Sequence, residues 1–359
     1  MKRLEVTDGH QLTLEPRAEG RPERVHVFSQ TEIDAVNAAL GAGRPLLVRG
    51  EPGVGKTQLA EAAAKCLGRV LLPFVVDAAS ESRDLLWQLD AVQRLADAQV
   101  LGAAGALSLL KKKGNDQGED QGMEIEGLLD ATREVLASKR YLHPGPLWWA
   151  FNWEDASSQA TLAKLAPPAV QAPGSGCVVL IDEIDKAESD LPNGLLEALG
   201  ARSFRPQGRT APVTAKDEQP LVIITTNEER TLPDAFVRRC LVLHLRLPDE
   251  DRETLIEYLI GRGKAHFEDA DRKVLQKAAS MIAEDRAKAD ANQWLPLPGQ
   301  AEYLDLVRAV LALERSAEAQ LQRLGALGRF VLEKHPDAAL AGDEARARAD
   351  DAKAPKQTD

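Results

Sequence analysis

Residues 46 to 59 read LLVRGEPGVGKTQL, and this stretch decides the fold. A short apolar run, Leu46 to Val48, leads into Gly50-x-x-x-x-Gly55-Lys56-Thr57, and alanine-rich helical sequence follows to Lys65. This order predicts a buried strand, a glycine-rich loop and a helix. Glycines let successive backbone amides turn inward around phosphate oxygens, and the positive end of the following helix adds to the attraction. The stretch therefore predicts a binding site for a nucleoside triphosphate.

The side chains of this loop have separate expected roles. Lys56 can reach the β- and γ-phosphates, and the hydroxyl of Thr57 can ligate Mg²⁺. The residues expected to contact the nucleotide are Gly50, Glu51, Pro52, Gly53, Val54, Gly55, Lys56, Thr57 and Gln58. The alternative, a glycine-rich turn that happens to precede a helix, is disfavoured by the length of the motif and its context. ATP and Mg²⁺ are the predicted cofactors.

A second motif, CVVLIDE, occupies residues 177 to 183. Five apolar residues predict a central parallel strand, and two carboxylates follow at its carboxyl end, where α/β sheets bind ligands. Asp182 is suited to the Mg²⁺ shell, and Glu183 to activating or positioning the water that attacks the γ-phosphate. Acidic residues after a strand are common on protein surfaces, but the glycine loop upstream favours the functional interpretation. Asp185 and Lys186, in the turn just beyond, are expected to have structural roles.

Further apolar runs predict the rest of the sheet. Residues 70 to 77, 221 to 227 and 240 to 245 each read as a buried strand. The sequence therefore predicts an α/β fold with a five-stranded parallel sheet, followed after Pro248 by a helical region. The expected domains are an N-terminal arm (1–30), an α/β core (31–248) with a helical insert at about 83–140, a helical lid (249–337) and a disordered tail (338–359).

The insert and its surroundings carry several secondary expectations. Residues 83 to about 110 have a helical pattern, and the run 114–122, rich in glycine and charge, is expected to be a mobile tip. The aromatic cluster at 148–153 could stack bases, but without interleaved Lys or Arg it favours packing against the core. Residues 203 to 213 predict a hairpin. Val27 and Phe28 are adenine-pocket candidates, with ordinary packing of the arm as an equal alternative.

Composition limits the class of protein. The formal net charge is −11, which disfavours nucleic acid as a partner unless a local basic patch exists. Three widely spaced cysteines predict neither disulfides nor a metal site. Neither a leader segment nor a membrane span is evident, so we expect a soluble cytoplasmic protein.

The glycine loop, the 178–183 strand end and the Thr225-Thr226-Asn227 strand end together resemble the AAA+ ATPases. The sequence DEIDKA at 182–187, the helix NGLLEAL at 193–199 and the segment PGPL at 144–147 are similar to the MoxR-like branch. This resemblance implies a homo-oligomeric ring, a hexamer, that acts on a partner protein, and it gives proteins with a von Willebrand factor A domain as candidate partners. It also implies that Asn227 positions the attacking water. Arg239, with Arg238 as second choice, is implied to reach the γ-phosphate of the neighbouring subunit.

One departure from the resemblance concerns the helical lid. Many relatives carry a second sensor arginine at the start of a lid helix, but residues 297 to 303 read LPGQAEY. The lid then senses nucleotide differently or not at all. Two alternative functions stay open: a nucleic-acid-directed motor, disfavoured by the acidity, and a nucleotide switch without turnover, disfavoured by Glu183 beside Asp182.

Overall fold

The computed structural model describes residues 2–16, 23–112, 130, 132–168, 174–188, 190–216, 218–332 and 334. Within these ranges the chain divides into two compact units. The first unit comprises residues 1–5, 34–48 and 63–243, and the second comprises 6–33, 49–62 and 244–359. The expected mobile tip at 114–122 and the expected tail at 338–359 lie outside the described residues.

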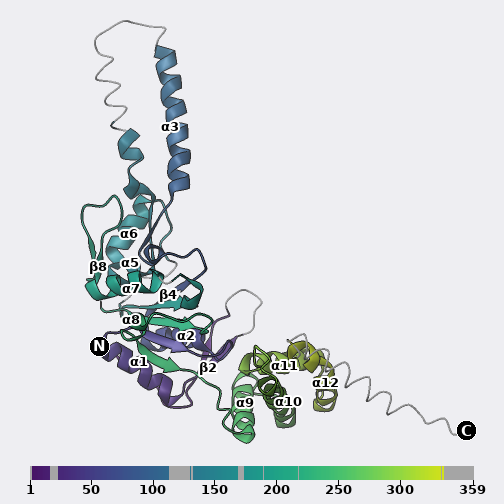
Figure 1. The fold of residues 1–359 in the computed structure, drawn as a ribbon. Coiled ribbons are helices and arrows are strands. Elements are labelled where there is room, and N and C mark those ends of the chain that lie inside the picture. Colours follow the sequence, from purple (N-terminus) through teal and green to yellow (C-terminus); the bar gives the residue numbers. More distant parts are fainter. Residues whose placement is uncertain are drawn as a thin grey trace, which may run out of the picture. The chain divides into compact units, whose positions relative to one another are not determined.

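The predicted five-stranded parallel sheet is confirmed, with strand order β11-β3-β10-β7-β4. Its strands are β3 (Leu46–Arg49), β4 (Val70–Val75), β7 (Cys177–Asp182), β10 (Leu221–Thr226) and β11 (Leu241–His244). The three middle strands are almost wholly buried because their apolar runs are covered on both faces. Helix α1 (Gln30–Ala42) precedes β3, and the helices α2 (Lys56–Leu67), α7 (Asp190–Ala201) and α8 (Asp234–Val237) lie in the connections between these strands (Figure 1).

The segment between β4 and β7 differs in part from the expectation. Residues 83–90 are not a continuous helix: a 3₁₀ turn at Ser82–Leu85 precedes β5 (Trp87–Leu89), which pairs antiparallel with β6 (Leu142–Pro144). The long helix α3 (Ala91–Lys112) starts only afterwards and extends away from the sheet (Figure 1). The helical periodicity concealed β5 because a three-residue strand is specified by its partner, more than 50 residues away, and not by its own pattern.

The aromatic cluster packs into the core, as its composition favoured. Helices α5 (Pro146–Phe151) and α6 (Trp153–Leu162) bury Trp148, Trp149, Phe151 and Trp153 in the main apolar cluster of the first unit. The predicted hairpin is also present, as β8 (Ser203–Phe204) and β9 (Val213–Thr214). Its Phe204 ring meets Trp148 edge to face at 5.7 Å between centroids.

The second unit has its own apolar cluster, built from α9 (Arg252–His266), α10 (Arg272–Ala291), α11 (Gln300–Leu313) and α12 (Ala317–Leu332). Val54 of the glycine loop packs against this cluster. An antiparallel pair, β1 (Gln11–Leu14) and β2 (Arg24–Val27), belongs to the same unit and contacts α9. The glycine loop is thus packed with the C-terminal helices α9 to α12, which places it in their unit and not in that of the sheet core.

Candidate functional site

The glycine loop begins where β3 ends and continues to Lys56, the first residue of α2. Gly50 and Gly53 have φ angles of +155° and +79°. A Cβ atom at Gly50 would lie 2.2 Å from the carbonyl oxygen of Leu245, and one at Gly53 would lie 2.6 Å from the Cβ of Ala301. Only glycine fits both the conformation and the space at these two positions.

Lys56 is buried and its ammonium group is held by the loop itself. Its Nζ donates hydrogen bonds to the carbonyl oxygens of Gly50, at 2.7 Å, and Glu51, at 2.8 Å. A cation is therefore fixed at the loop, and the loop opens onto the N-terminus of α2, whose amides carry partial positive charge. This arrangement attracts anions, as a phosphate-binding loop requires.

The acidic motif lies at the carboxyl end of β7 and is joined to the neighbouring strand by a hydroxyl group. In the parallel register of β10 and β7, Ile224 lies opposite Ile181, so the next pair is Thr225 and Asp182. The Thr225 hydroxyl donates to Oδ1 of Asp182 at 2.6 Å and accepts the backbone N–H of Glu183 at 2.9 Å. Since Thr225 is fully buried, this bridge fixes both acidic residues to β10.

The backbone at Glu183 is left-handed, with φ 62° and ψ 49°. This conformation is uncommon for a residue with a side chain and occurs often at functional sites. The Glu183 carboxylate pairs with the ammonium of Lys186, three residues on. This hydrogen bond raises the pKa of Lys186. The side chain of Glu183 is thus directed by a strained backbone and by a neighbouring cation.

Asp185 holds the strand end that carries Asn227. It is buried, and its two carboxylate oxygens accept the backbone N–H groups of Asn227, at 3.4 Å, and Glu229, at 3.0 Å. The half-buried Asn227 follows β10 directly and so lies at the same edge of the sheet as Asp182. Asp185 fixes a loop backbone, which is the structural role expected of it.

Arg238 and Arg239 directly follow the short helix α8 and are both exposed. Neither pairs with a carboxylate among the residues that the structure describes. The turn that carries them is held from behind by Arg44, whose guanidinium donates to the carbonyl oxygens of Arg238, Arg239 and Cys240. The two arginines are therefore presented to solvent on a fixed backbone.

The adenine-pocket candidates lie beside a buried ionisable cluster of the second unit. The Phe28 ring is buried and meets His26 edge to face at 4.6 Å, and Arg262 of α9 donates to the carbonyl oxygen of Val27 at 2.8 Å. Burial, helped by the positive charge of Arg262, lowers the pKa of His26 to about 3. Burial raises the pKa of Glu32, whose carboxylate lies 3.7 Å from His26. The cluster ties the N-terminal segment to α9.

Sequence patterns did not identify three residues that shape these regions: Thr225, Arg44 and Arg286. Thr225 belongs to the strand end Thr225-Thr226-Asn227, which was singled out from the sequence. Its position next to Asp182 could be inferred only once β10 and β7 were known to be neighbours. Arg44 and Arg286 carried no local signal, because their partners are distant in the chain. Arg286 of α10 donates to the Glu51 carboxylate through both Nη atoms, at 2.8 Å each.

The described residues form no ready-made metal site from protein side chains alone. No group of three or more His, Cys, Asp or Glu side chains that could hold a metal exists within the described ranges. One carboxylate and one hydroxyl, as in Asp182 and Thr57, suit Mg²⁺, which keeps several waters and takes its remaining oxygens from substrate phosphates. The chemistry of each of these two side chains, taken by itself, thus suits Mg²⁺ delivered with a nucleotide.

A glycine loop between a parallel strand and a helix, with acidic residues ending another strand of the same sheet, defines a P-loop nucleotide-binding protein. Residues 45–240 match the family model of the AAA domain of the dynein-related subfamily. The chain belongs to this family, and membership implies ATPase activity. The AAA part of the sequence resemblance is therefore confirmed.

The comparison with solved structures finds Thermotoga maritima RuvB, as two different mutants, and a Cytophaga hutchinsonii protein described as a candidate ATPase. The RuvB structures are 14% and 15% identical with TM-scores of 0.41 and 0.38, covering 83% of this chain and 69% and 67% of theirs. The third is 14% identical with a TM-score of 0.34, covering 84% of this chain and 80% of that one. Among curated proteins no significant match exists.

Proposed function

We propose that this AAA-family protein binds ATP with Mg²⁺ and hydrolyses it at the interfaces of a homo-oligomeric ring, in order to remodel or assemble a partner protein. The observation that supports this most strongly is the Thr225 bridge. It fixes Asp182 and Glu183 at the end of β7 in a chain that also carries a complete glycine loop.

The proposed mechanism divides the work among residues already described. Lys56 and the loop amides would bind the β- and γ-phosphates, and Thr57 and Asp182 would hold Mg²⁺, which would supply positive charge to the phosphates. Glu183 accepts a proton from the attacking water, and Asn227 orients that water. Arg239, or Arg238, reaches the γ-phosphate bound by an adjacent subunit. The exposure of both arginines supports this last role.

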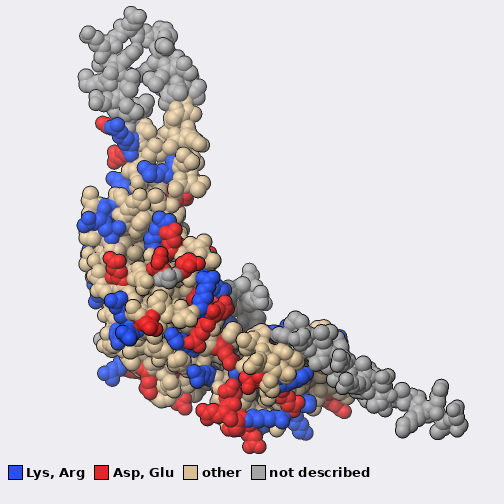
Figure 2. Space-filling view, viewed as in Figure 1, with Lys and Arg blue, Asp and Glu red and all other residues tan. Residues whose placement is uncertain are grey.

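A partner protein is supported by the surface of α3. Val92, Leu95 and Val100 are 81%, 61% and 68% exposed, although large apolar side chains are usually covered. The described part of this helix is mostly uncharged on the face drawn in Figure 2. We propose a protein client as the occupant, as in the MoxR-like branch, with a von Willebrand factor A domain protein as one possibility.

The rival function, a nucleic-acid-directed motor, has less support. On the face drawn in Figure 2, acidic and basic side chains are interspersed and do not form a continuous basic stripe. Phosphate-backbone binding needs clustered Lys and Arg. DNA or RNA that stimulates ATP turnover in a salt-dependent manner would favour this rival.

The proposed function is tested first by ATP binding. Lys56→Ala removes the cation held at the loop, so we expect titration calorimetry to show no ATP binding at concentrations that saturate the wild type. Lys65→Ala, an exposed lysine at the far end of the same helix, is the matched control and should bind as the wild type does. Equal affinities for Lys56→Ala and the wild type would refute the assignment of the loop.

A further inference from the structure

Arg286 of α10 is a buried cation whose hydrogen-bonding capacity is completely used. Only 5% of the residue is exposed. Nε and Nη2 donate to Asp249 at 3.1 and 2.7 Å, Nη1 and Nη2 donate to Glu51 at 2.8 Å each, and Nη1 donates to the carbonyl oxygen of Pro298 at 3.2 Å. A guanidinium has five N–H donors, and all five are engaged.

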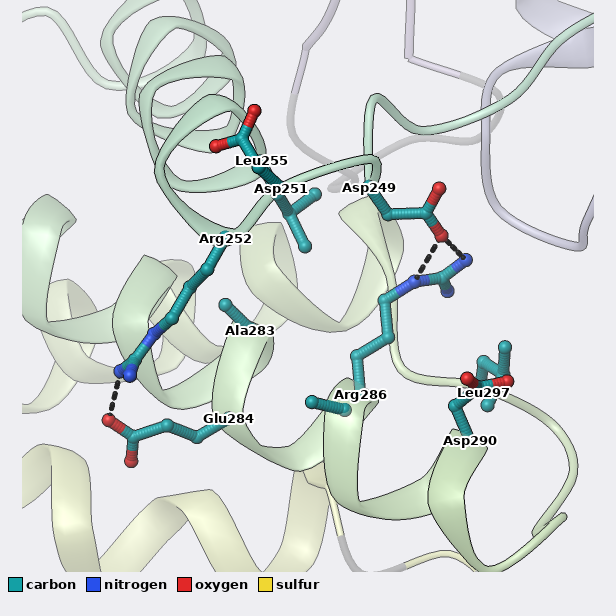
Figure 3. Close-up of a pocket in the computed structure, with 10 residues that line it drawn as sticks. Asp249, Asp251, Arg252, Leu255, Ala283, Glu284, Arg286, Asp290 and Leu297 are labelled. Atoms are coloured by element: carbon teal, nitrogen blue, oxygen red, sulfur yellow. Dashed lines mark hydrogen bonds and ion pairs between the residues drawn. The ribbon is translucent and has the colours of Figure 1, made fainter.

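These five bonds connect three separate segments of the second unit. Glu51 belongs to the glycine loop, Asp249 to the connection between β11 and α9, and Pro298 to the connection between α10 and α11. Figure 3 shows the Arg286 guanidinium turned toward Asp249 at a cavity of about 430 Å³. Arg252, on the same cavity, points instead to Glu284 and is exposed.

The charges explain why this junction is held firmly. Burial disfavours the charge of Arg286, but the bonds to Glu51 and Asp249 outweigh it and raise the pKa of Arg286. A buried charge that loses one of its partners is strongly destabilised, so the guanidinium is not free to release Glu51 without a substitute anion. The phosphates of a nucleotide bound at the loop would introduce negative charge close to this pair.

Two further contacts join the same loop to the same helices. Gly53 lies so close to Ala301, in the first turn of α11, that a Cβ at Gly53 would clash, and Val54 packs on the apolar cluster of α9 to α12. Ala301 lies in the segment 297–303, where the sequence has no arginine. The C-terminal helices therefore meet the loop through small side chains there, and their charged contact comes from α10.

We infer that Arg286 is a positioning residue that transmits nucleotide binding from the glycine loop, through Glu51, to α10 and the start of α11. This inference rests on the proposed function, since it requires ATP at the loop. The Arg286 guanidinium bonds to Glu51 and not to a phosphate. It thus takes the place of an arginine at residues 297–303 that would contact the nucleotide directly. Nucleotide that changes the position of Glu51 then changes the order of the segment from Glu284 to Leu304.

The test compares hydrogen–deuterium exchange with and without the slowly hydrolysed analogue ATPγS. In the wild type we expect the analogue to slow exchange at residues 50–57 and at 284–304. Arg286→Lys keeps the charge but loses the planar fork, and Arg286→Gln removes the charge but keeps an N–H donor. In both variants the analogue should still protect 50–57, while the protection that it adds at 284–304 falls at least about fivefold.

Controls separate this coupling from a purely structural role. Arg252→Lys, on the same cavity but without contact to the loop, should respond as the wild type does. If 284–304 gains the same nucleotide-induced protection in the variants as in the wild type, the inference is overturned. If wild-type residues 50–57 bind no ATPγS, the proposed function fails instead, and the inference with it.

Discussion

The glycine loop and the acidic end of β7 are held in place by different kinds of interaction. The loop is packed with the C-terminal helices and is held by an ion pair between the partly exposed Glu51 and the buried Arg286. The acidic end is held within the sheet core by register, by the neutral Thr225 hydroxyl and by backbone N–H groups bonded to Asp185. Sheet register is rigid, whereas an ion pair responds to added charge. On this basis we propose that nucleotide occupancy is communicated through the loop, while the acidic end of β7 stays fixed.

This comparison makes binding and turnover separable by mutation. Substitutions in the first unit should leave ATP affinity intact and lower turnover, and the largest such effect is expected at Arg239. An arginine that neutralises γ-phosphate charge from a neighbouring subunit contributes a rate factor on the order of 10³–10⁵ in other phosphoryl-transfer enzymes. Arg239→Ala should bind ATP normally, by calorimetry, and lose turnover by such a factor. Arg230→Ala, another exposed arginine of the same unit, is the control.

Mixing two inactive variants tests whether Arg239 acts between subunits. When Arg239→Ala and Glu183→Gln assemble randomly in equal amounts, ~1/4 of the interfaces keep both intact residues. Turnover should return at these interfaces. Co-assembly without any recovery would exclude Arg239 as the residue acting in trans, and the same experiment with Arg238→Ala would then examine the second candidate.

Glu183→Gln on its own should bind ATP as tightly as the wild type but hydrolyse it about 10²–10⁴ times more slowly. The amide keeps the shape of the side chain and cannot accept the proton. Single-turnover measurement of phosphate release, beside calorimetry, separates the two effects. A variant that loses affinity and turnover together would show that the acidic end also binds the nucleotide, which contradicts the division drawn above.

Thr225→Val should lower turnover about 100-fold with a small change in ATP affinity. The substitution removes the donor to Asp182 and leaves the Glu183 N–H without its hydroxyl acceptor, so both side chains shift, and a displacement of about 1 Å can reduce rates to that extent. Thr225→Ser keeps the hydroxyl and should restore most of the rate. A valine variant with wild-type turnover would show that the bridge does not position the acidic residues.

The strands and both motifs could be predicted because their signals are local. Each buried strand is a continuous apolar run, and the loop needs glycine at fixed spacing whatever surrounds it. Strand order also limits where Asp182 and Asn227 can lie, since both end neighbouring strands at one edge. The resemblance contributed the candidate roles of Asn227 and Arg239, which spacing alone does not provide.

The residues that support the site could not be predicted for a common physical reason. Arg286 pairs with a carboxylate 235 positions away, and Arg44 caps a turn 194 to 196 positions away. The sequence around a single arginine on an amphipathic helix looks the same whether its side chain faces solvent or a buried partner. The strand β5 was missed likewise, because its pairing with β6 depends on the fold around it.

The last difference between the units concerns how stability depends on pH. It is the smallest of the effects predicted here. His26 of the second unit has its pKa lowered to about 3 in the folded chain, against an ordinary value of 6.5. Between pH 6.5 and pH 3, His26 binds more protons in the unfolded chain than in the folded one. The contribution of neutral His26 to the free energy of unfolding is therefore complete above pH 6.5 and is lost as the pH falls toward 3. From pH 7 to pH 5 this amounts to about 2 kcal/mol. Glu32, whose pKa is raised by burial, acts in the opposite direction, so the comparison must be made between variants.

His26→Gln should therefore lose about 2 kcal/mol less than the wild type between pH 7 and pH 5 when urea unfolding is followed at both values. His244→Gln, at an exposed position, should keep the wild-type dependence. Exchange of the α9 amides, beside His26 through Arg262, should rise first on acidification, because the buried imidazole opens this unit when it takes up a proton. Equal pH dependence in wild type and His26→Gln would show that Glu32 and Arg262 compensate the imidazole fully, and the acid sensitivity would no longer distinguish the unit that holds the glycine loop from the unit that holds the sheet core.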